Sequence, residues 1–506
     1  MEAGRSCRLS MTRIYSLLLL HFFICIVLFT IHPLIAPRVI PYGLIGVTLI
    51  ITFGLAAHLL LAYPSERMNP FALLSFVYSL QFAVAIYLVK WHKVVSRNEL
   101  MQYYNNIEEN NLVEALRLSY IFSFFTIGMA FLFARSAFWP RILQTMNKAL
   151  DHDRKLLLLV SYGITLIEFM LIASGKVTLQ GESLIGRDKS NIEVNPFVSI
   201  INPIACLAVF LSAYLFTKTK DKKLLLLLLI QFVWFFLWGR RQIVFFTFLT
   251  FIGFFYERKI ILSKLTVRNL RMMVVSAVLF FMVINAAKFY QQLRTVGGVA
   301  VLQNVTITSL RKVINLYQSS DNIELKKASE YNVEIRALST VAAVAHYEKL
   351  LASGGVQLAN GQELYNNFLK ATPSNFFVDK SSVLIMEGLA SKLSSGKIRA
   401  NRDLGGTLIL ESMIDFGRLG VYIYPLVLTI IILAFFWMLV RVNNPFVMLW
   451  FVIALDYSML SMVESSIGDL FLAMRVTLFV MLIMGMFWIT KRTLLTKPVK
   501  GHHYQT

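Results

Sequence analysis

Apolar residues run through most of the chain in long blocks that short polar segments separate. A helix needs about 20 predominantly apolar residues to cross the ~30 Å hydrocarbon core of a bilayer. The blocks predict about twelve such helices, at a period and length typical of membrane spans. They cover residues 14–32, 39–62, 71–90, 111–134, 155–173, 196–217, 223–238, 242–256, 271–288, 419–440, 445–463 and 470–490. We therefore expect an all-α, polytopic membrane protein.

One hydrophilic segment, residues 289–404, interrupts this pattern and is too long to be a plain connection. Helical spacing of apolar residues recurs within it, at 305–318 and 330–352. We expect a small, mainly helical loop domain on the outer side of the membrane. The predicted organisation is a membrane domain of about nine helices over 1–288, the loop domain over 289–404, the last three spans within 405–490 and a tail over 491–506.

Composition supports a membrane protein and changes how the charge is interpreted. Of 506 residues, 57% are hydrophobic and 15% are charged, whereas soluble domains carry about 25% charged residues. The net charge of +21 would suit a nucleic-acid partner, but most basic loops fall on one side if both termini are cytoplasmic, as the positive-inside rule requires. We expect the bilayer as a partner and no nucleic acid. The three cysteines have neither disulfide nor metal-ligand spacing, so no metal is predicted.

Arginines that break the positive-inside rule are the first candidate site residues. Arg240 and Arg241 join two predicted spans of about 15 residues each, which reach roughly 22 Å and would leave the tip of the hairpin below the outer surface. Two adjacent guanidinium groups there require a counter-ion, and their planar forks suit a phosphate. The alternative is that both side chains reach out to lipid headgroups.

A second intramembrane cation is Arg475, which lies within the last predicted span near its outer end. A charge at this depth indicates a functional site or a structural ion pair. Its expected partners are Glu464, Asp469 or a bound anion. Either interpretation requires the side chain to face the interior of the helix bundle.

Two acids and an arginine, Glu411, Asp415 and Arg418, stand at the entrance to the span that follows the loop domain. Their spacing of four and three residues would place them on one face of a continuous helix. Arg418 would then join the other arginines in binding an anionic substrate such as a pyrophosphate. A carboxylate among cations is a candidate general base, because the cations keep it ionised while desolvation raises its basicity. Alternatively, each acid simply pairs with an arginine.

Three residues of the loop segment complete the predicted site. Arg294 follows the span at 271–288, and Arg336 interrupts an otherwise apolar helix face. His346 lies on the same predicted helix as Arg336, where a surface role is the ordinary alternative. All three could contact an anionic substrate on the outer side.

Several short stretches together resemble the Wzy-type polymerases of O-antigen and other oligosaccharide repeat units. The resemblance is carried by the layout of about twelve spans, WGRRQ (238–242), GQELYNNFLKATPSNF (361–376), and the pattern E-x-x-x-x-FG-x-x-G at Glu411, Phe416, Gly417 and Gly420. The chain departs from the family after its proline element, where TPSNFFVDK lacks the usual aromatic, proline and basic residues.

The resemblance implies a metal-independent glycosyltransferase of GT-C-like architecture in the inner (cytoplasmic) membrane of a bacterium, with both termini cytoplasmic. Donor and acceptor would both be glycans linked to undecaprenyl pyrophosphate, with no cofactor, and a separate protein would regulate chain length. Arg240, Arg241 and Arg475 would then bind the pyrophosphate, and Glu411 or Asp415 would take the proton of the acceptor hydroxyl. The open alternatives are an O-antigen ligase, which uses lipid A-core as acceptor, and a lipid-linked oligosaccharide flippase or other transporter.

Overall fold

The computed structural model describes twelve stretches of the chain, which together contain the elements discussed below. They are residues 40–62, 69–87, 109–136, 138–150, 154–173, 196–219, 221–237, 340–372, 383–384, 387–395, 407–462 and 466–495. Within these residues every regular element is a helix and there is no strand. The all-α prediction is therefore confirmed for the described part of the chain.

Nine predicted spans coincide with helices in the described ranges, and their bounds agree with the prediction to within a few residues. These helices are α2 (Ile40–Ala62), α3 (Pro70–Tyr87), α5 (Glu109–Arg135), α7 (Arg154–Ala173), α8 (Pro196–Thr219), α9 (Lys222–Leu237), α17 (Gly420–Val442), α18 (Pro445–Ser461) and α19 (Gly468–Leu495). The predicted spans at 14–32, 242–256 and 271–288 lie outside the described residues. Long apolar runs form helices here because a buried backbone must satisfy its own polar groups.

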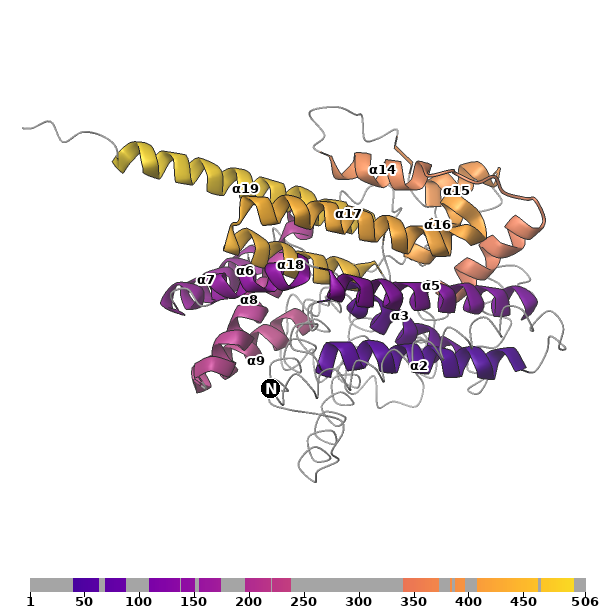
Figure 1. The fold of residues 1–506 in the computed structure, drawn as a ribbon, viewed down its shortest axis with the longest axis horizontal. Coiled ribbons are helices and arrows are strands. Elements are labelled where there is room, and N and C mark those ends of the chain that lie inside the picture. Colours follow the sequence, from indigo (N-terminus) through magenta and orange to yellow (C-terminus); the bar gives the residue numbers. More distant parts are fainter. Residues whose placement is uncertain are drawn as a thin grey trace, which may run out of the picture.

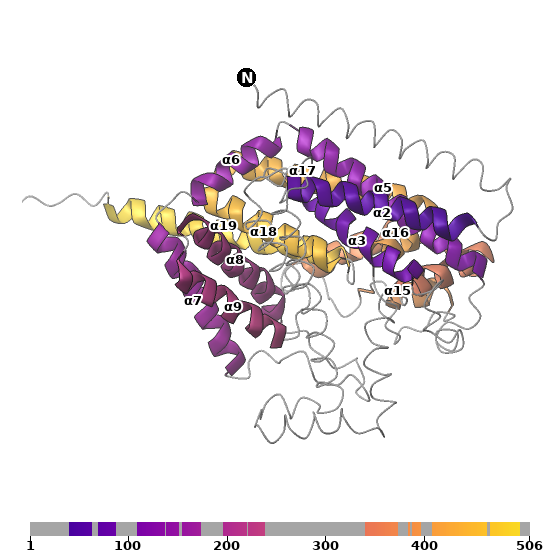
Figure 2. The ribbon, with the colours of Figure 1, turned by 90° about the horizontal axis from the view of Figure 1, so that it is seen from below.

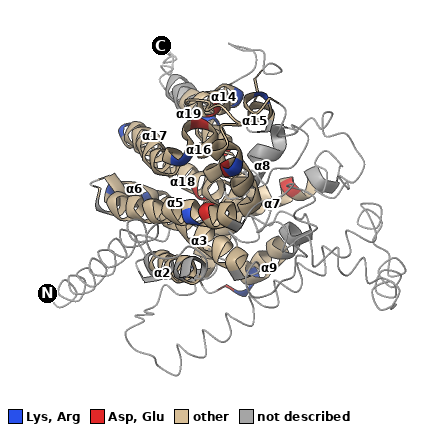
Figure 3. Cartoon of the chain, turned by 90° about the vertical axis from the view of Figure 1, so that its right-hand side faces the viewer, with Lys and Arg blue, Asp and Glu red and all other residues tan. Residues whose placement is uncertain are grey.

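Three helical stretches among the described residues are long and apolar enough to cross a membrane. They are Asn110–Ala134, Leu408–Val442 and Gly468–Met486. Shorter apolar helices cover Ile45–Ala56, Pro70–Ile86, Pro203–Phe216 and Pro445–Ser461. Figure 3 shows that most positions along the described helices are uncharged, as is usual for helices in a lipid environment. The molecule is thus a helical protein that associates with a membrane.

Six of the described helices form two groups that α18 joins. Helices α2, α3 and α5 pack on one another at one side, and α7, α8 and α9 at the other (Figures 1 and 2). Helix α18 contacts α3 of the first group and α8 of the second. All of its described residues from Val447 to Ser461 are buried, as expected for a helix with neighbours on every face.

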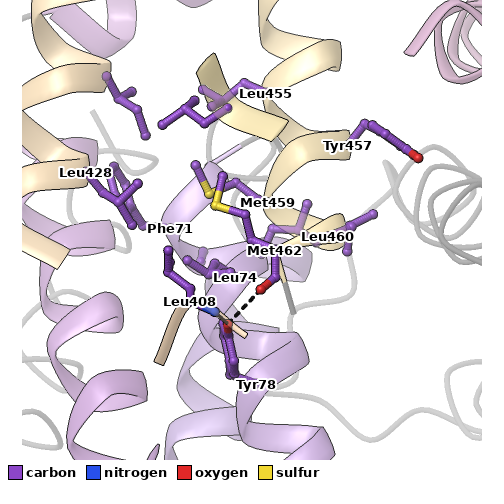
Figure 4. Close-up of a cluster of buried hydrophobic side chains, with 14 of the residues drawn as sticks. Phe71, Leu74, Tyr78, Leu408, Leu428, Leu455, Tyr457, Met459, Leu460 and Met462 are labelled. Carbon is purple, nitrogen blue, oxygen red and sulfur yellow. Dashed lines mark hydrogen bonds between the residues drawn. The ribbon is translucent and has the colours of Figure 1, made fainter. Parts of the chain in front are cut away.

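A tyrosine fixes the point where α3 meets the last third of the chain. The hydroxyl of Tyr78 donates to the carbonyl of Met462 at 2.9 Å and accepts from the amide of Leu408 at 3.2 Å. Figure 4 shows this hydroxyl reaching Met462 among Phe71, Leu74 and other apolar side chains. A buried phenol requires such partners, and here they tie the end of α18 and the start of α16 (Leu408–Phe416) to α3.

Helix α6 (Phe138–Leu150) lies between the predicted spans at 111–134 and 155–173, where no helix was predicted. Its apolar face, with Trp139, Ile142 and Met146, is buried, and Arg141 and Lys148 on the opposite face are exposed. The helix packs on α18 and α17, so its amphipathic pattern reflects contact with the bundle.

The loop segment 289–404 is helical where the structure describes it. Residues 340–352 form a helix, followed by α14 (Gln362–Ala371) and the short α15 (Glu387–Leu393). The predicted helix at 305–318 lies outside the described residues. Helix α14 packs on α19 and on α16 (Leu408–Phe416), which brings the loop segment against the last spans (Figure 1).

Candidate active site

Two glycines shape the corner at which α16 ends and α17 begins. Gly417 has φ +59°, a conformation that residues other than glycine rarely adopt. A 3₁₀ turn, η5 (Gly417–Leu419), begins at this residue. At Gly420 a Cβ atom would lie 1.9 Å from the carbonyl oxygen of Ser412, so only glycine lets the two helices approach this closely. These contacts give a physical reason for both glycines of the FG-x-x-G pattern.

Asp415, at the end of α16, binds the start of α14. Its Oδ1 accepts from the backbone amide of Glu363 at 2.8 Å, and its Oδ2 accepts from the amide of Leu364 at 3.0 Å and from the hydroxyl of Tyr424 at 2.7 Å. These amides are among the first four of α14, which have no acceptor within the helix. A carboxylate there also suits the positive end of the helix dipole.

The loop before α14 in turn donates hydrogen bonds to the C-terminus of α16. The amides of Ala359 and Asn360 donate to the carbonyls of Ile414 and Asp415, both at 2.9 Å. Carbonyls at a helix C-terminus likewise lack partners within their own helix. The C-terminus of α16 and the N-terminus of α14 therefore cap each other, and the two sequence islands GQELY and E-x-x-x-x-FG-x-x-G meet in space.

Glu411 lies one turn before Asp415 and contacts two elements. Its Oε2 accepts from the amide of Ile467 at 2.9 Å, just before α19, and its Oε1 accepts from Nδ2 of Asn367 at 3.4 Å. The same Nδ2 donates to Oε1 of Glu363 at 2.8 Å. Glu363, Glu411 and Asp415 are each 0% exposed. We call these three residues the acidic junction.

Arg475 binds the opposite end of α14. Its Nη1 donates to the carbonyl of Ala371, the last residue of that helix, at 2.9 Å. A cation at a helix C-terminus suits the helix dipole. The ring of Phe368 adds an edge-to-face contact with Phe471 on α19, with centroids 5.6 Å apart. The expected partner of Arg475 was an acid or an anion, and among the described residues the contact is a helix carbonyl.

Two of the predicted site residues bind opposite ends of α14 and are therefore apart from each other. A helix of 10 residues is about 15 Å long, so Asp415 and Arg475 bind points that far apart. Asn367, in the middle of the helix, links Glu411 to the same element. The structure therefore brings Glu411, Asp415 and Arg475 to one helix without joining them in a single contact.

Arg418 differs from the prediction that it shares a helix face with Glu411 and Asp415. That expectation is wrong because α16 ends at Phe416 and Arg418 lies on the 3₁₀ turn beyond Gly417. Its side chain is 53% exposed and pairs with Glu348 of the helix at 340–352, with Glu114 of α5 4.0 Å from its Nε. Arg418 thus ties the loop segment to α5, and its predicted role in substrate binding stays a prediction.

Two titratable groups beside the junction have shifted pKa values. Burial raises the pKa of the Tyr347 phenol well above its usual range, and the negative charge of Asp415 adds to the effect. The Tyr347 hydroxyl has no hydrogen-bond partner in the structure. Burial lowers the pKa of the Lys370 ammonium, and the carboxylate of Glu363 partly offsets this. The region is thus dry enough to disfavour additional charge.

The remaining predicted residues divide into two sets. His346 lies half-buried on the helix at 340–352, next to Tyr347. Arg240, Arg241, Arg294 and Arg336 lie outside the described residues, so their predicted roles stay predictions. Among the described residues, no group of three or more His, Cys, Asp or Glu is arranged to hold a metal ion.

Sequence reasoning missed two members of the site, Glu363 and Asn367. Both belong to the GQELYNNF stretch and are buried. Their spacing of four residues, which places an acid and an amide on one helical face, was a readable signal. No family model, no curated protein and no solved structure matches the chain.

Proposed function

We propose that this chain is a membrane glycosyltransferase that polymerises oligosaccharide repeat units linked to undecaprenyl pyrophosphate, at the outer face of a bacterial inner membrane. The proposal includes about twelve spans in a GT-C-like arrangement with both termini cytoplasmic. The loop segment 289–404 would then face the periplasm, where it covers the site.

The observation that carries the proposal is the mutual capping of α16 and α14. Two of the sequence islands that carry the resemblance to Wzy-type polymerases are separated by 34 residues, between Phe376 and Glu411. Asp415 and the amides of Glu363 and Leu364 join them directly. Motifs that meet at a buried, charged contact support a common role more strongly than motifs that stay apart.

In the proposed reaction a hydroxyl oxygen of the acceptor sugar forms a bond to the anomeric carbon of the donor. The bond between that carbon and the diphosphate oxygen breaks, and undecaprenyl pyrophosphate leaves with the electron pair. Glu411 would accept the hydroxyl proton, a contribution typically of about 10²–10⁴ in rate. Asp415 would hold α14 in place, because it accepts three short hydrogen bonds, two of them from the backbone of that helix. Glu411 accepts one backbone amide and a longer contact of 3.4 Å from Asn367.

The leaving diphosphate requires positive charge. Of the N–H donors of Arg475, only Nη1 has a described partner, and a guanidinium has five, so the others can bind an anion. Arg240 and Arg241 would supply the remaining charge. Fixed donors in a dry site stabilise developing negative charge by about 3 kcal/mol each.

The test is in vitro polymerisation of a lipid-linked repeat unit by the full chain purified in lipid. We expect a ladder of polymer, a loss of at least about 100-fold with Glu411→Gln, and a comparable loss with Arg475→Gln. Arg441→Gln is the matched control for Arg475, because Arg441 is exposed and stacks on Trp437. Asp221→Asn, at an exposed acid, is the control for Glu411.

Two other outcomes would overturn the proposal. Transfer of the glycan to lipid A-core, with no lipid-linked polymer, would make the chain a ligase. Movement of the lipid-linked unit across a vesicle membrane without any new glycosidic bond would make it a flippase. Full polymerase activity in both Glu411→Gln and Arg475→Gln would leave the activity standing and remove this site.

A further inference from the structure

A second set of buried acids lies on helices other than those of the acidic junction. Glu168 of α7 is 2% exposed and Asp456 of α18 is 3% exposed. Neither oxygen of Glu168 has a hydrogen-bond partner in the structure, and Oδ1 of Asp456 has none either. Buried polar groups are almost always hydrogen-bonded, so this pair requires an explanation.

Helix α8 lies between the two acids, since it packs on both α7 and α18. Its Cys206 is 0% exposed, and the carboxyl groups of Glu168 and Asp456 both act electrostatically on its thiol. Both acids therefore lie within electrostatic range of Cys206, at the contacts that α8 makes with α7 and α18.

Other polar groups along this interface do find partners. The hydroxyls of Ser161 and Ser212 are 2.6 Å apart, and Nε2 of Gln231 donates to Oγ1 of Thr165 at 2.8 Å. Ser161, Thr165 and Glu168 follow at helical spacing on one face of α7. The oxygen of the Gln231 amide is buried without a partner in the structure. Among the described residues, the polar face of α7 is thus satisfied at its hydroxyls and unsatisfied at its carboxyl group.

No described cation neutralises these acids. The basic side chains described on α7, α8, α18 and the helices packed on them are exposed, at Arg141, Lys148, Lys155, Lys218, Lys222, Lys223 and Arg441, apart from Arg475, which binds the Ala371 carbonyl. A carboxylate buried without a counter-charge or a hydrogen bond takes up a proton instead of remaining ionised. Acids of this kind within a membrane commonly belong to proton or ion pathways.

We propose that Glu168 and Asp456 form a proton-binding site inside the helix bundle, in which both carboxyl groups are protonated while α7, α8 and α18 are packed together. The protons exchange with water when this interface opens. Helix α8 can bend at Pro203, three residues before Cys206, because proline has no amide to bond to the carbonyl four residues earlier. The proposal does not depend on the glycosyltransferase activity.

The test is infrared difference spectroscopy of the full chain in lipid, which separates the carbonyl stretch of a protonated carboxyl group from that of a carboxylate. At neutral pH we expect Glu168→Gln and Asp456→Asn each to remove intensity from the protonated band. Asp221→Asn, at an exposed acid that caps Lys223, is the matched control and should leave that band unchanged. A reversible loss of the same intensity in the wild type as pH is raised would demonstrate exchange.

Each result decides the proposal. A protonated band that neither variant changes would show that the two acids are ionised, and would overturn it. A band that persists at all pH values until the protein unfolds would show that no exchange occurs, and would overturn it too. If one variant fails to fold, Glu168→Asp, which keeps the carboxyl group, and the wild-type pH series still distinguish these outcomes.

Discussion

The acidic junction and the α7–α8–α18 interface both bury Asp and Glu side chains almost completely, but these acids differ in the hydrogen bonds that they receive. Asp415 is 0% exposed and receives hydrogen bonds from two backbone amides and a phenol. Glu168 is 2% exposed and, in the structure, receives none. Both groups have left water, and only one has gained partners in return.

The difference shows that the donors around a buried acid, and not its burial alone, decide what it does. Backbone amides at a helix N-terminus favour a carboxylate and are themselves satisfied by it, so Asp415 joins two segments of the chain. Where donors are lacking, desolvation favours the neutral acid, so Glu168 is suited to carry a proton. The first arrangement stabilises the contact between two segments, and the second provides a group that can bind and release a proton.

The largest effect should follow Asp415→Ala. The substitution leaves the amides of Glu363 and Leu364 and the Tyr424 hydroxyl without an acceptor, at about 1–3 kcal/mol each. We therefore expect the free energy of unfolding to fall by about 4 kcal/mol and α14 to undock. Thermal unfolding in detergent, with proteolysis of the loop before α14, measures both. Asp221→Ala removes a similar cap at an exposed helix start and should cost about 1 kcal/mol. Equal losses in the two variants would contradict the importance of the junction.

Gly420→Ala should come next. A Cβ atom 1.9 Å from the Ser412 carbonyl forces α16 and α17 apart, which costs about 3 kcal/mol as overpacking of a well-fitted contact. Gly485→Ala in α19 meets nothing within 4 Å and should stabilise its helix by about 0.5–1 kcal/mol. Thermal unfolding of both variants is the measurement. Similar melting temperatures for the two would show that the corner at Gly417–Gly420 can relax.

A matched pair of substitutions tests the comparison directly. Glu411→Met leaves the buried amide of Ile467 without its acceptor and removes one of the contacts of Asn367 Nδ2, so it should destabilise the protein by about 2 kcal/mol. Glu168→Met replaces unsatisfied polar atoms by apolar ones of similar volume, so its effect should lie between zero and a gain of about 1 kcal/mol. Both changes can be followed by thermal unfolding. A large loss at Glu168 would mean that this acid has a partner in solution.

The sequence predicted the helices well and the site only in part. Long apolar runs decide where helices form, since a backbone out of water has few other choices, and nine predicted segments are helical in the described ranges. The prediction that Arg418 shares a helix face with Glu411 and Asp415 was wrong because Gly417 ends the helix. The spacing of residues in a sequence does not reveal a single residue with positive φ.

The contacts of Asp415 and Arg475 could not have been predicted from spacing either. Each binds the backbone of α14, at its first amides and at the carbonyl of Ala371. Backbone groups carry no sequence signature, so charged residues that cap a distant helix look like members of an ion pair or a ligand site. Glu168 and Asp456 escaped notice for a related reason, because a lone acid in an apolar run does not identify its neighbours.

The smallest expected effect concerns Tyr347, which lies beside the acidic junction and whose hydroxyl has no partner in the structure. The phenol of the unfolded chain ionises near pH 10.0, whereas burial raises the pKa of the folded form above this value. Above about pH 10 the unfolded state therefore binds fewer protons than the folded state, and the stability of the wild type should fall as pH rises. Tyr347→Phe should remove that fall and change stability at neutral pH by no more than about 1 kcal/mol. Tyr365→Phe, at an exposed phenol on α14, is the control, and thermal unfolding between neutral and alkaline pH is the measurement. A fall that persists unchanged in Tyr347→Phe would show that the Tyr347 hydroxyl reaches water in the folded protein, which would place the junction closer to the protein surface than the structure does.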